Sequence, residues 1–359
     1  MRRSLRYAAM ALVVTFVASC SLFDYSSLAG KKYALVYGVT NYVNPLEYSW
    51  TSYDSPNLEY PAIDATSMVS VLTAAGYTIV ASRWVTSSSH VIYNGSDVGA
   101  IGYNTGSSTY STGAGDAYAP TKANIEADIQ SLVGVLGKND TIVVYFSGHG
   151  TQDTSVSPNR EYFDPLGSVQ YYSTASPPGY YADVAVAVRD DELGSYFASL
   201  PTNRRILILD TCYSGGFIGN SVEVDAASQT VITYDSSGNP ISYQTVTVSA
   251  VDVLAKAIAN YASYATSASG LSPYNAHVIA AAGKDESSYE TSSLGHGVMT
   301  YALLQAAGKA DLNGDGVITL GEAYSYVKAW IDAYWNVSGG SIDNFEPRIS
   351  GGPVDFVLF

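Results

Sequence analysis

Two apolar runs, each followed by a turn with a chemically distinctive side chain, constrain the fold of this chain most strongly. Residues 141–146 have the sequence TIVVYF and residues 205–209 have the sequence RILIL. Unbroken runs of this kind are typical of strands that are buried on both faces of a parallel sheet. Ligands of open α/β sheets bind at the carboxyl ends of the strands, so we expect both turns at one functional edge. The turns are Ser147-Gly-His-Gly150 and Asp210-Thr-Cys-Tyr-Ser-Gly-Gly216.

The rest of the chain alternates strand-like and helix-like segments. This alternation predicts an α/β domain over residues 32–359, with a mainly parallel sheet and right-handed crossovers. Residues 86–120 and 217–275 are rich in small and polar side chains, so we expect two long insertions, the first a surface loop. Strand patterns lie at residues 32–39, 77–85 and 277–282, and helical patterns at 64–75, 121–136 and 193–200.

The N-terminus has the features of a targeting segment. Three arginines precede the apolar stretch Ala8 to Val17, which is too short to span a bilayer as a stable helix. The stretch ends in Val17-Ala-Ser-Cys20, which resembles a bacterial lipoprotein signal. The resemblance implies a signal peptide at residues 1–19, lipidation of Cys20, and a tether at residues 20–31 that holds the protein on a cell-envelope membrane. The alternative is an ordinary secretory signal with a chance cysteine.

Charge and cysteine content narrow the function further. The chain has 17 Lys and Arg against 32 Asp and Glu, a formal net charge of −15, so it lacks the basic surface that nucleic-acid binding requires. Its two cysteines are Cys20 and Cys212. If Cys20 carries lipid, Cys212 is the only thiol and no internal disulfide forms. A single exported thiol at a strand end indicates a reactive group, and the alternative is a small buried side chain.

A cysteine beside a histidine is the minimal arrangement for thiolate chemistry. A free thiol is mostly protonated at neutral pH, so Cys212 needs a base, and His149 can serve as acid and base. The glycines on either side of His149 allow the backbone to approach a substrate closely. The amides of Cys212 and Gly150 can donate to a developing oxyanion. Each turn alone is a weak signal, and the two together are a strong one.

The two turns resemble the catalytic turns of the caspase and metacaspase family of cysteine peptidases, in its bacterial branch. The segment Tyr33-Ala-Leu-Val-Tyr-Gly-Val-Thr-Asn-Tyr42 and the helix that begins Ile63-Asp64-Ala65 are similar to the first strand and helix of that family. The resemblance implies a three-layer caspase-like sandwich and polypeptide substrates. It also implies that Cys212 is the nucleophile and His149 the general acid and base.

An acidic side chain next to the nucleophile indicates the preferred substrate. Asp210 lies two residues before Cys212, on the same face of its strand, so its carboxylate can reach a pocket beside the thiol. An acid there favours arginine or lysine before the scissile bond and disfavours aspartate. The family resemblance implies that Asp64 and Ser147 assist. The alternatives are a turn cap for Asp210 and a helix N-cap for Asp64.

A second motif predicts calcium binding. Residues 311–322 match the twelve-residue EF-hand loop and lie between the helical patterns 298–307 and 320–335. The alternative is a polar turn without metal. Asp190 and Asp191 resemble an acidic pair that binds calcium in some metacaspases, and the alternative is a helix N-terminus that favours acids. The predicted Ca²⁺ ligands of the loop are Asp311, Asn313, Asp315, Val317, Thr319 and Glu322.

Two functions fit these features. The first is a lipid-anchored cysteine endopeptidase of the cell envelope that faces the periplasm or the exterior. The second is a non-catalytic, caspase-like interaction domain. The complete set of His149, Cys212 and Asp210 favours the peptidase, because a scaffold needs none of them. A zinc site is not predicted, because His90, His277 and His296 lack ligand spacing around a cysteine pair.

Overall fold

The structure is a computed structural model of the whole chain. It describes residues 30–43, 55–102, 113–157, 159–172, 175, 178–218, 233–234, 240–242, 276–336, 344–350 and 356–359. The predicted signal peptide and Cys20 lie outside these residues. Within them, no helix has both the length and the apolar character needed to span a membrane.

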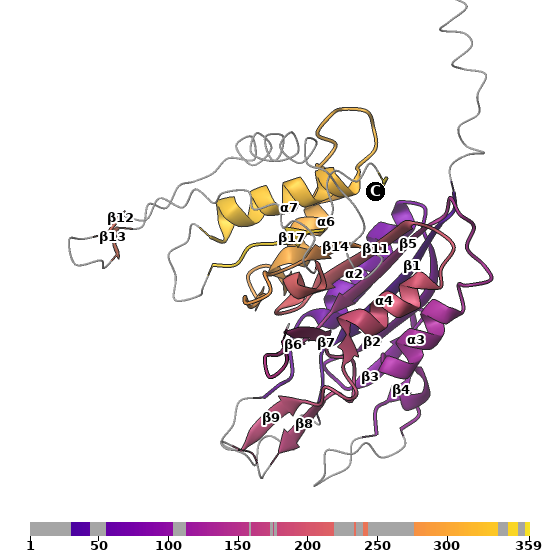
Figure 1. The fold of residues 1–359 in the computed structure, drawn as a ribbon, viewed down its shortest axis with the longest axis vertical. Coiled ribbons are helices and arrows are strands. Elements are labelled where there is room, and N and C mark those ends of the chain that lie inside the picture. The colour runs from indigo at the N-terminus through magenta and orange to yellow at the C-terminus, as the bar shows by residue number, and fades with distance from the viewer. Residues whose placement is uncertain are drawn as a thin grey trace, which may run out of the picture.

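An eight-stranded sheet forms the centre of the molecule, in the order β17-β14-β11-β5-β1-β2-β3-β4 (Figure 1). The five strands from β14 to β2 are parallel to their neighbours, and β3, β4 and β17 pair antiparallel at the two edges. The expectation of a mainly parallel sheet is therefore confirmed. The strands are β1 (Lys32–Val39), β2 (Thr78–Val85), β3 (His90–Tyr93), β4 (Ser96–Ala100), β5 (Thr141–Ser147), β11 (Arg204–Asp210), β14 (His277–Ala280) and β17 (Arg348–Ile349).

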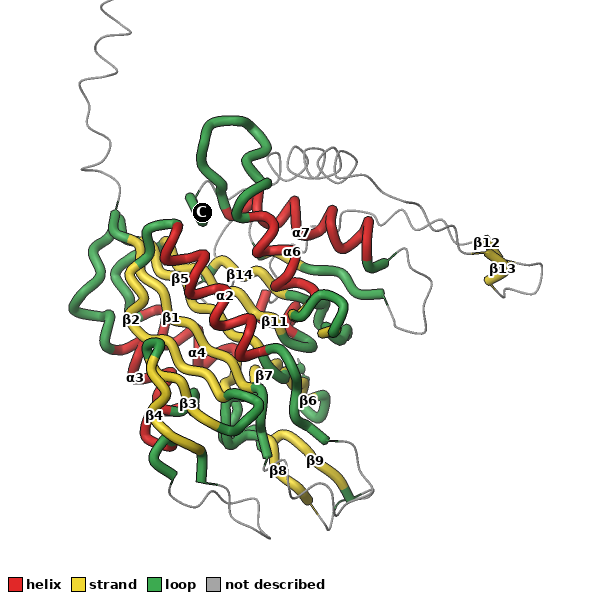
Figure 2. The backbone as a smooth tube through the Cα atoms, turned by 180° about the vertical axis from the view of Figure 1, so that it is seen from behind, coloured by secondary structure: helices red, strands yellow, loops and turns green. Residues whose placement is uncertain are grey.

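Helices cover both faces of the sheet. Figure 1 views the face under α3 and α4, and Figure 2 views the opposite face, which α2 crosses and beside which α6 and α7 pack. The apolar β5 side chains enter two cores in alternation, because successive strand residues point to opposite faces. Val143 and Tyr145 enter one core, and Val144 and Phe146 enter the other. The helices are α2 (Pro61–Ala74), α3 (Lys122–Gln130), α4 (Asp190–Ala198), α6 (Val298–Ala306) and α7 (Leu320–Tyr334).

Several short elements accompany the central sheet. A three-stranded sheet in the order β10-β7-β6 continues directly from the His149 turn. Its strands are β6 (Gly150–Asp153), β7 (Arg160–Phe163) and β10 (Val188–Arg189). The other pairs are β8 (Val169–Tyr172) with β9 (Gly179–Ala182), β12 (Thr233–Tyr234) with β13 (Pro240–Ser242), and β15 (Glu290–Thr291) with β16 (His296–Gly297). Two 3-10 turns are η3 (Asp116–Tyr118) and η4 (Ser214–Ile218).

The expected surface loop at residues 86–120 is wrong over its described part. Strands β3 and β4 extend the central sheet there, and Val91 is fully buried. The hairpin turns at Asn94 and Gly95, which have φ angles of 47° and 80°. Two successive positive φ angles are the mark of a type I′ turn, for which Asn-Gly is the preferred pair. The second predicted insertion, 217–275, lies outside the described residues except at its start and at the β12–β13 pair.

Candidate active site

The register of β5 and β11 brings the two predicted catalytic turns together. These strands are parallel neighbours, and Ser147 pairs with Asp210 at their ends. His149 and Cys212 each lie two residues beyond that pair. A methyl group added at Gly150 would lie 2.2 Å from the carbonyl oxygen of Cys212, so the two turns are in direct backbone contact. The sequence-based expectation that both side chains share one edge of the sheet is confirmed.

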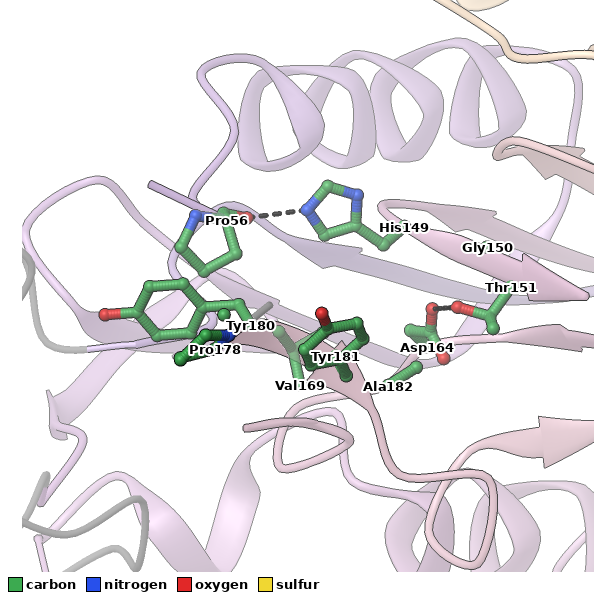
Figure 3. Close-up of a pocket in the computed structure, with 11 residues that line it drawn as sticks. Pro56, His149, Gly150, Thr151, Asp164, Val169, Pro178, Tyr180, Tyr181 and Ala182 are labelled. Atoms are coloured by element: carbon green, nitrogen blue, oxygen red, sulfur yellow. Dashed lines mark hydrogen bonds between the residues drawn. The ribbon is translucent and has the colours of Figure 1, made fainter. Parts of the chain in front are cut away.

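The imidazole of His149 is oriented by groups from another part of the chain. Its Nε2 lies 2.6 Å from the carbonyl oxygen of Pro56 (Figure 3). A carbonyl oxygen only accepts hydrogen bonds, so Nε2 carries the proton and Nδ1 of the neutral ring is free to act as a base. Burial lowers the pKa of His149, and the Pro56 carbonyl opposes this shift. The ring is therefore neutral at pH 7, as a general base requires.

Tyr42 holds the backbone of the histidine turn. Its hydroxyl accepts a hydrogen bond from the His149 amide over 2.8 Å and donates to the carbonyl oxygen of Asp164, also over 2.8 Å. Its ring lies against the imidazole, with 4.8 Å between the ring centroids. The sequence indicated Tyr42 as part of the first-strand segment but assigned it no role, and Pro56 carried no local signal.

Cys212 is a free, partly buried thiol. Burial raises its pKa, and hydrogen bonding from the Ser288 backbone opposes this shift less strongly. Its Sγ also lies 3.8 Å from the Ser288 carbonyl oxygen, which accepts from the thiol. The resting group is therefore a thiol and not a thiolate. Cys212 and His149 make no direct hydrogen bond, as is common before substrate binds. The amide of Cys212 has no acceptor among the described residues, which leaves it free for an oxyanion.

The residue after the nucleophile has an unusual backbone conformation. Tyr213 has a φ of 57°, in the left-handed region that residues other than glycine seldom adopt. Its amide donates to the carbonyl oxygen of Glu286 over 2.9 Å, and this bond holds the turn. Strain of this kind persists where the surrounding structure over-determines the backbone, and it is common at catalytic turns.

The three predicted specificity residues gather in one buried acid cluster. Ser147 donates to Oδ2 of Asp64 over 2.9 Å, and the amide of Gly297 donates to both oxygens of Asp64 over 3.2 and 3.3 Å. Asp210 receives the amide and hydroxyl of Thr300 at Oδ2, over 3.0 and 2.7 Å. A methyl group at Gly297 would lie 2.4 Å from Asp210 Oδ2 and 3.1 Å from Asp64 Oδ2. Both carboxylates therefore flank the same backbone atom.

Burial and mutual repulsion keep these two acids from ionising easily. Burial, as the larger cause, and the negative charge of Asp64, as the next, raise the pKa of Asp210 to about 7. Burial also raises the pKa of Asp64, although its hydrogen bonds favour the ionised form. Asp64 does not cap its own helix, because Tyr60 is the N-cap of α2 and all the hydrogen-bond donors to the Asp64 carboxylate come from other elements. A buried acid pair of this kind has a strong affinity for a cation.

His296 belongs to this cluster, and sequence analysis missed it. Its Nδ1 lies 2.8 Å from Asp64 Oδ1, although 232 residues separate the two along the chain. No apolar strand leads into His296 and no second cysteine accompanies it, so its sequence context indicated neither a catalytic nor a zinc-binding role. The available signal was its position in the Gly295-His296-Gly297 turn directly before a helical pattern.

A cavity of about 440 Å³ lies on the β8–β9 side of His149. Figure 3 shows Asp164 close to Thr151, and Thr151 donates to Asp164 Oδ2 over 2.6 Å. The other oxygen of Asp164 is buried without a hydrogen-bond partner, and burial raises the pKa of this carboxyl to about 7. The lining residues are Pro56, His149, Gly150, Thr151, Asp164, Val169, Pro178, Gly179, Tyr180, Tyr181 and Ala182.

The predicted calcium loop lies between α6 and α7, as expected. Asp311 accepts the amides of Gly314, Asp315 and Gly316, so its carboxylate organises the turn. The donor set consists of hard oxygens, which suits Ca²⁺. Glu322 is fully buried, and its carboxylate accepts from the amides of residues 312, 313 and 319 and from the Thr319 hydroxyl. It would have to leave some of these donors to bind a metal in bidentate fashion.

The second predicted calcium pair lies at the start of α4. Asp191 forms an ion pair with Arg189, and Asp190 Oδ1 accepts the Asp191 amide over 2.7 Å. Across the described part of the chain, no group of three or more His, Cys, Asp and Glu side chains is arranged to hold a metal ion. Acids at a helix N-terminus account for this pair without a metal.

Comparison with known proteins places the chain in a family. The caspase domain family model matches residues 31–329. The chain belongs to the caspase domain family. Protein GSU0716 from Geobacter sulfurreducens is a similar solved structure, with a TM-score of 0.47 and 16% identity over 90% of this chain and 93% of that one. Caspase-1 from Spodoptera frugiperda has a TM-score of 0.42 and 10% identity over 91% and 90%. No curated protein matches the chain.

Proposed function

We propose that this caspase-domain protein is a cysteine endopeptidase that cuts after arginine or lysine. The observation that carries the proposal is the β5–β11 register, which sets His149 and Cys212 at equal distances beyond a paired position. Membership of the caspase domain family supports polypeptide substrates. Partly buried hydrogen bonds hold the histidine turn, so the site is organised before substrate binds.

The protonation states indicate general-base catalysis. Because Cys212 rests as a thiol and His149 as a neutral base, the imidazole takes the thiol proton as Sγ attacks the scissile carbonyl carbon. The oxyanion that forms accepts hydrogen bonds from the amides of Cys212 and Gly150. The protonated His149 then gives its proton to the leaving amine, and an acyl-enzyme remains. Water, deprotonated by the same imidazole, hydrolyses that thioester.

The acid cluster supports the preference for basic side chains. Asp210 is two residues from the nucleophile, and no donor among the described residues reaches its Oδ1. A guanidinium or ammonium group supplies the missing charge partner and favours the ionised form of Asp210. An aspartate side chain in the same place adds a third negative group and is repelled.

Alanine variants of the two proposed catalytic residues test this function. Cys212→Ala and His149→Ala are each expected to abolish cleavage of arginine-ended fluorogenic peptides while the circular dichroism spectrum and melting temperature stay close to those of the parent. His90→Ala, at an exposed histidine of β3, is the matched control and retains activity. Wild-type rates in either catalytic variant would remove the dyad. A parent protein that cleaves no peptide would favour the interaction-domain alternative.

We also propose that the protein is anchored at a cell-envelope membrane and binds calcium. The arginines and the Val17-Ala-Ser-Cys20 motif support lipid anchoring through Cys20 at a cell-envelope membrane, facing the periplasm or exterior. Expression of Cys20→Ala in a Gram-negative host is expected to move the protein from the membrane to the soluble fraction, and unchanged membrane association would contradict the anchor. The oxygen-rich loop at residues 311–322 supports calcium binding there.

A further inference from the structure

The acid cluster already contains a basic side chain of its own. His296 lies on β16, and its Nδ1 contacts Asp64 Oδ1 over 2.8 Å. Among the described residues, it is the one basic side chain in contact with either Asp64 or Asp210. Neither the catalytic step nor the expected role of the acids in substrate binding requires this histidine.

The exposure of the pair shows which partner faces outward. The Asp64 side chain is 1% exposed and that of His296 is 17% exposed. Ser147 and Gly297 occupy other positions around the Asp64 carboxylate. A cation that approaches Asp64 from solvent therefore meets the imidazole first. Asp210 has no such cover from a positive group, since its two hydrogen bonds both come from Thr300.

We propose that His296 is a specificity-determining residue that competes with the basic side chain of the substrate for Asp64. The inference rests on the proposed function of the acid cluster as the binding site for that side chain. While the imidazole holds Asp64, that acid is satisfied within the protein and Asp210 alone faces the substrate. When the imidazole is displaced or removed, both acids are available and the substrate cation binds more tightly.

Within the described part of the chain, the neighbouring groups around His296 are acidic or neutral. Asp64 comes from α2, Asp210 and its hydrogen-bonded Thr300 from β11 and α6, and Glu290 from β15, the partner strand of β16. The ring centroids of Tyr301, from α6, and His296 are 6.2 Å apart. Tyr145, from β5, interacts electrostatically with Asp64 and Asp210.

The test is the variant His296→Gln. Glutamine keeps a hydrogen-bond donor for Asp64 but cannot carry charge. We expect the KM for an arginine-ended peptide to fall roughly three- to tenfold with kcat nearly unchanged, the size of effect that a partly exposed ion pair supports. KM is measured for the variant and the parent at pH 5.5 and at pH 8. Asp210 also titrates, so the ratio of variant to parent KM is compared at each pH.

The matched control is His90→Gln, which removes an exposed histidine that also pairs with an aspartate, Asp97, over 2.9 Å. It should leave KM unchanged at every pH. A merely structural role for His296 would lower the melting temperature and kcat together without lowering KM, and that result would overturn the proposal. An unchanged or higher KM in His296→Gln would overturn it as well.

A binding experiment separates this inference from the proposed function. Agmatine, which carries the guanidinium of arginine, is titrated by calorimetry into Cys212→Ala and into Cys212→Ala with His296→Gln. Tighter binding to the double variant at pH 5.5 supports the competition even if the parent hydrolyses no peptide. Equal or weaker binding contradicts it even if the parent is an active peptidase. If His296→Gln does not fold, His296→Asn takes its place in both experiments.

Discussion

Asp210→Asn should make the protein more stable and less active at the same time. Burial and the charge of Asp64 raise the pKa of Asp210 to about 7 from an ordinary value of 3.8. A carboxyl with such a raised pKa costs the folded chain up to about 4 kcal/mol once it is ionised in both states. Because Asp64 and Asp210 share this cost, we expect a gain of about 1–4 kcal/mol in the free energy of unfolding at pH 8.

The raised pKa of Asp210 determines the pH range over which the parent loses stability. Between about pH 4 and pH 7 the folded chain keeps a proton on Asp210 that the unfolded chain has lost, so the parent loses stability as the pH rises through this window. Asparagine is neutral throughout and can still accept from Thr300. The variant and parent should therefore be about equally stable near pH 4, and the variant more stable at pH 8.

Urea unfolding at pH 4.5 and pH 8 measures this difference. The control is Asp128→Asn, which breaks a buried pair in which Arg83 Nε lies 2.7 Å from Asp128 Oδ2. That variant leaves a buried guanidinium unpaired and should lose about 3–5 kcal/mol at pH 8. A stability difference between Asp210→Asn and the parent that is the same at both pH values would contradict the raised pKa of Asp210. So would a variant that is less stable than the parent at pH 8.

The same substitution tests specificity. Removing one partner of a desolvated charge pair costs about 2–5 kcal/mol, so kcat/KM for an arginine-ended peptide should fall by about 30-fold to several thousandfold. The value for a peptide ended by an uncharged residue should change little. Equal losses for both peptides would mean that Asp210 supports the site and does not select the substrate.

Two further predictions concern a glycine and the calcium loop. Gly150→Ala should reduce kcat at least tenfold with KM little changed. The new methyl group would lie 2.2 Å from the Cys212 carbonyl oxygen and must push the two turns apart. A parent-like kcat would contradict that contact. Calcium at about 5 mM should raise the melting temperature by roughly 2–6 °C if the loop binds with an affinity of about 10⁻⁴ to 10⁻³ M. Asp315→Asn, at an exposed loop position, should abolish most of that shift, and an equal shift in both proteins would place the effect elsewhere.

The strands that position the dyad could be predicted from sequence because their signal is local. The runs at residues 141–146 and 205–209 are continuous and apolar, and a strand buried on both faces needs that pattern. The β3–β4 hairpin also had a local signal, the Asn94-Gly95 pair, but the surrounding small and polar residues obscured it. The error there was in the interpretation of composition and not in a missing signal.

The partners of the catalytic and acidic groups could not be predicted, because tertiary packing alone brings them together. Pro56 contacts His149 although 93 residues separate them in the sequence. The contact uses a backbone carbonyl, which every residue has, so the residue type gives no signal. His296 reaches Asp64 across 232 residues from a two-residue strand. By contrast, the proximity of Asp64, Ser147 and Asp210 was expected from the family resemblance, and the hydrogen bonds and backbone contacts of the structure place them in one cluster.

Covalent labelling tests whether Cys212 is a reactive nucleophile that depends on His149. The purified protein is incubated with peptidyl acyloxymethyl ketones that end in arginine or in aspartate, and intact mass and peptide mapping locate the adduct. We predict one adduct per chain, on Cys212, formed faster with the arginine reagent and greatly slowed in His149→Ala. Faster labelling by the aspartate reagent, or no labelling of Cys212 by either reagent in the folded protein, would contradict it.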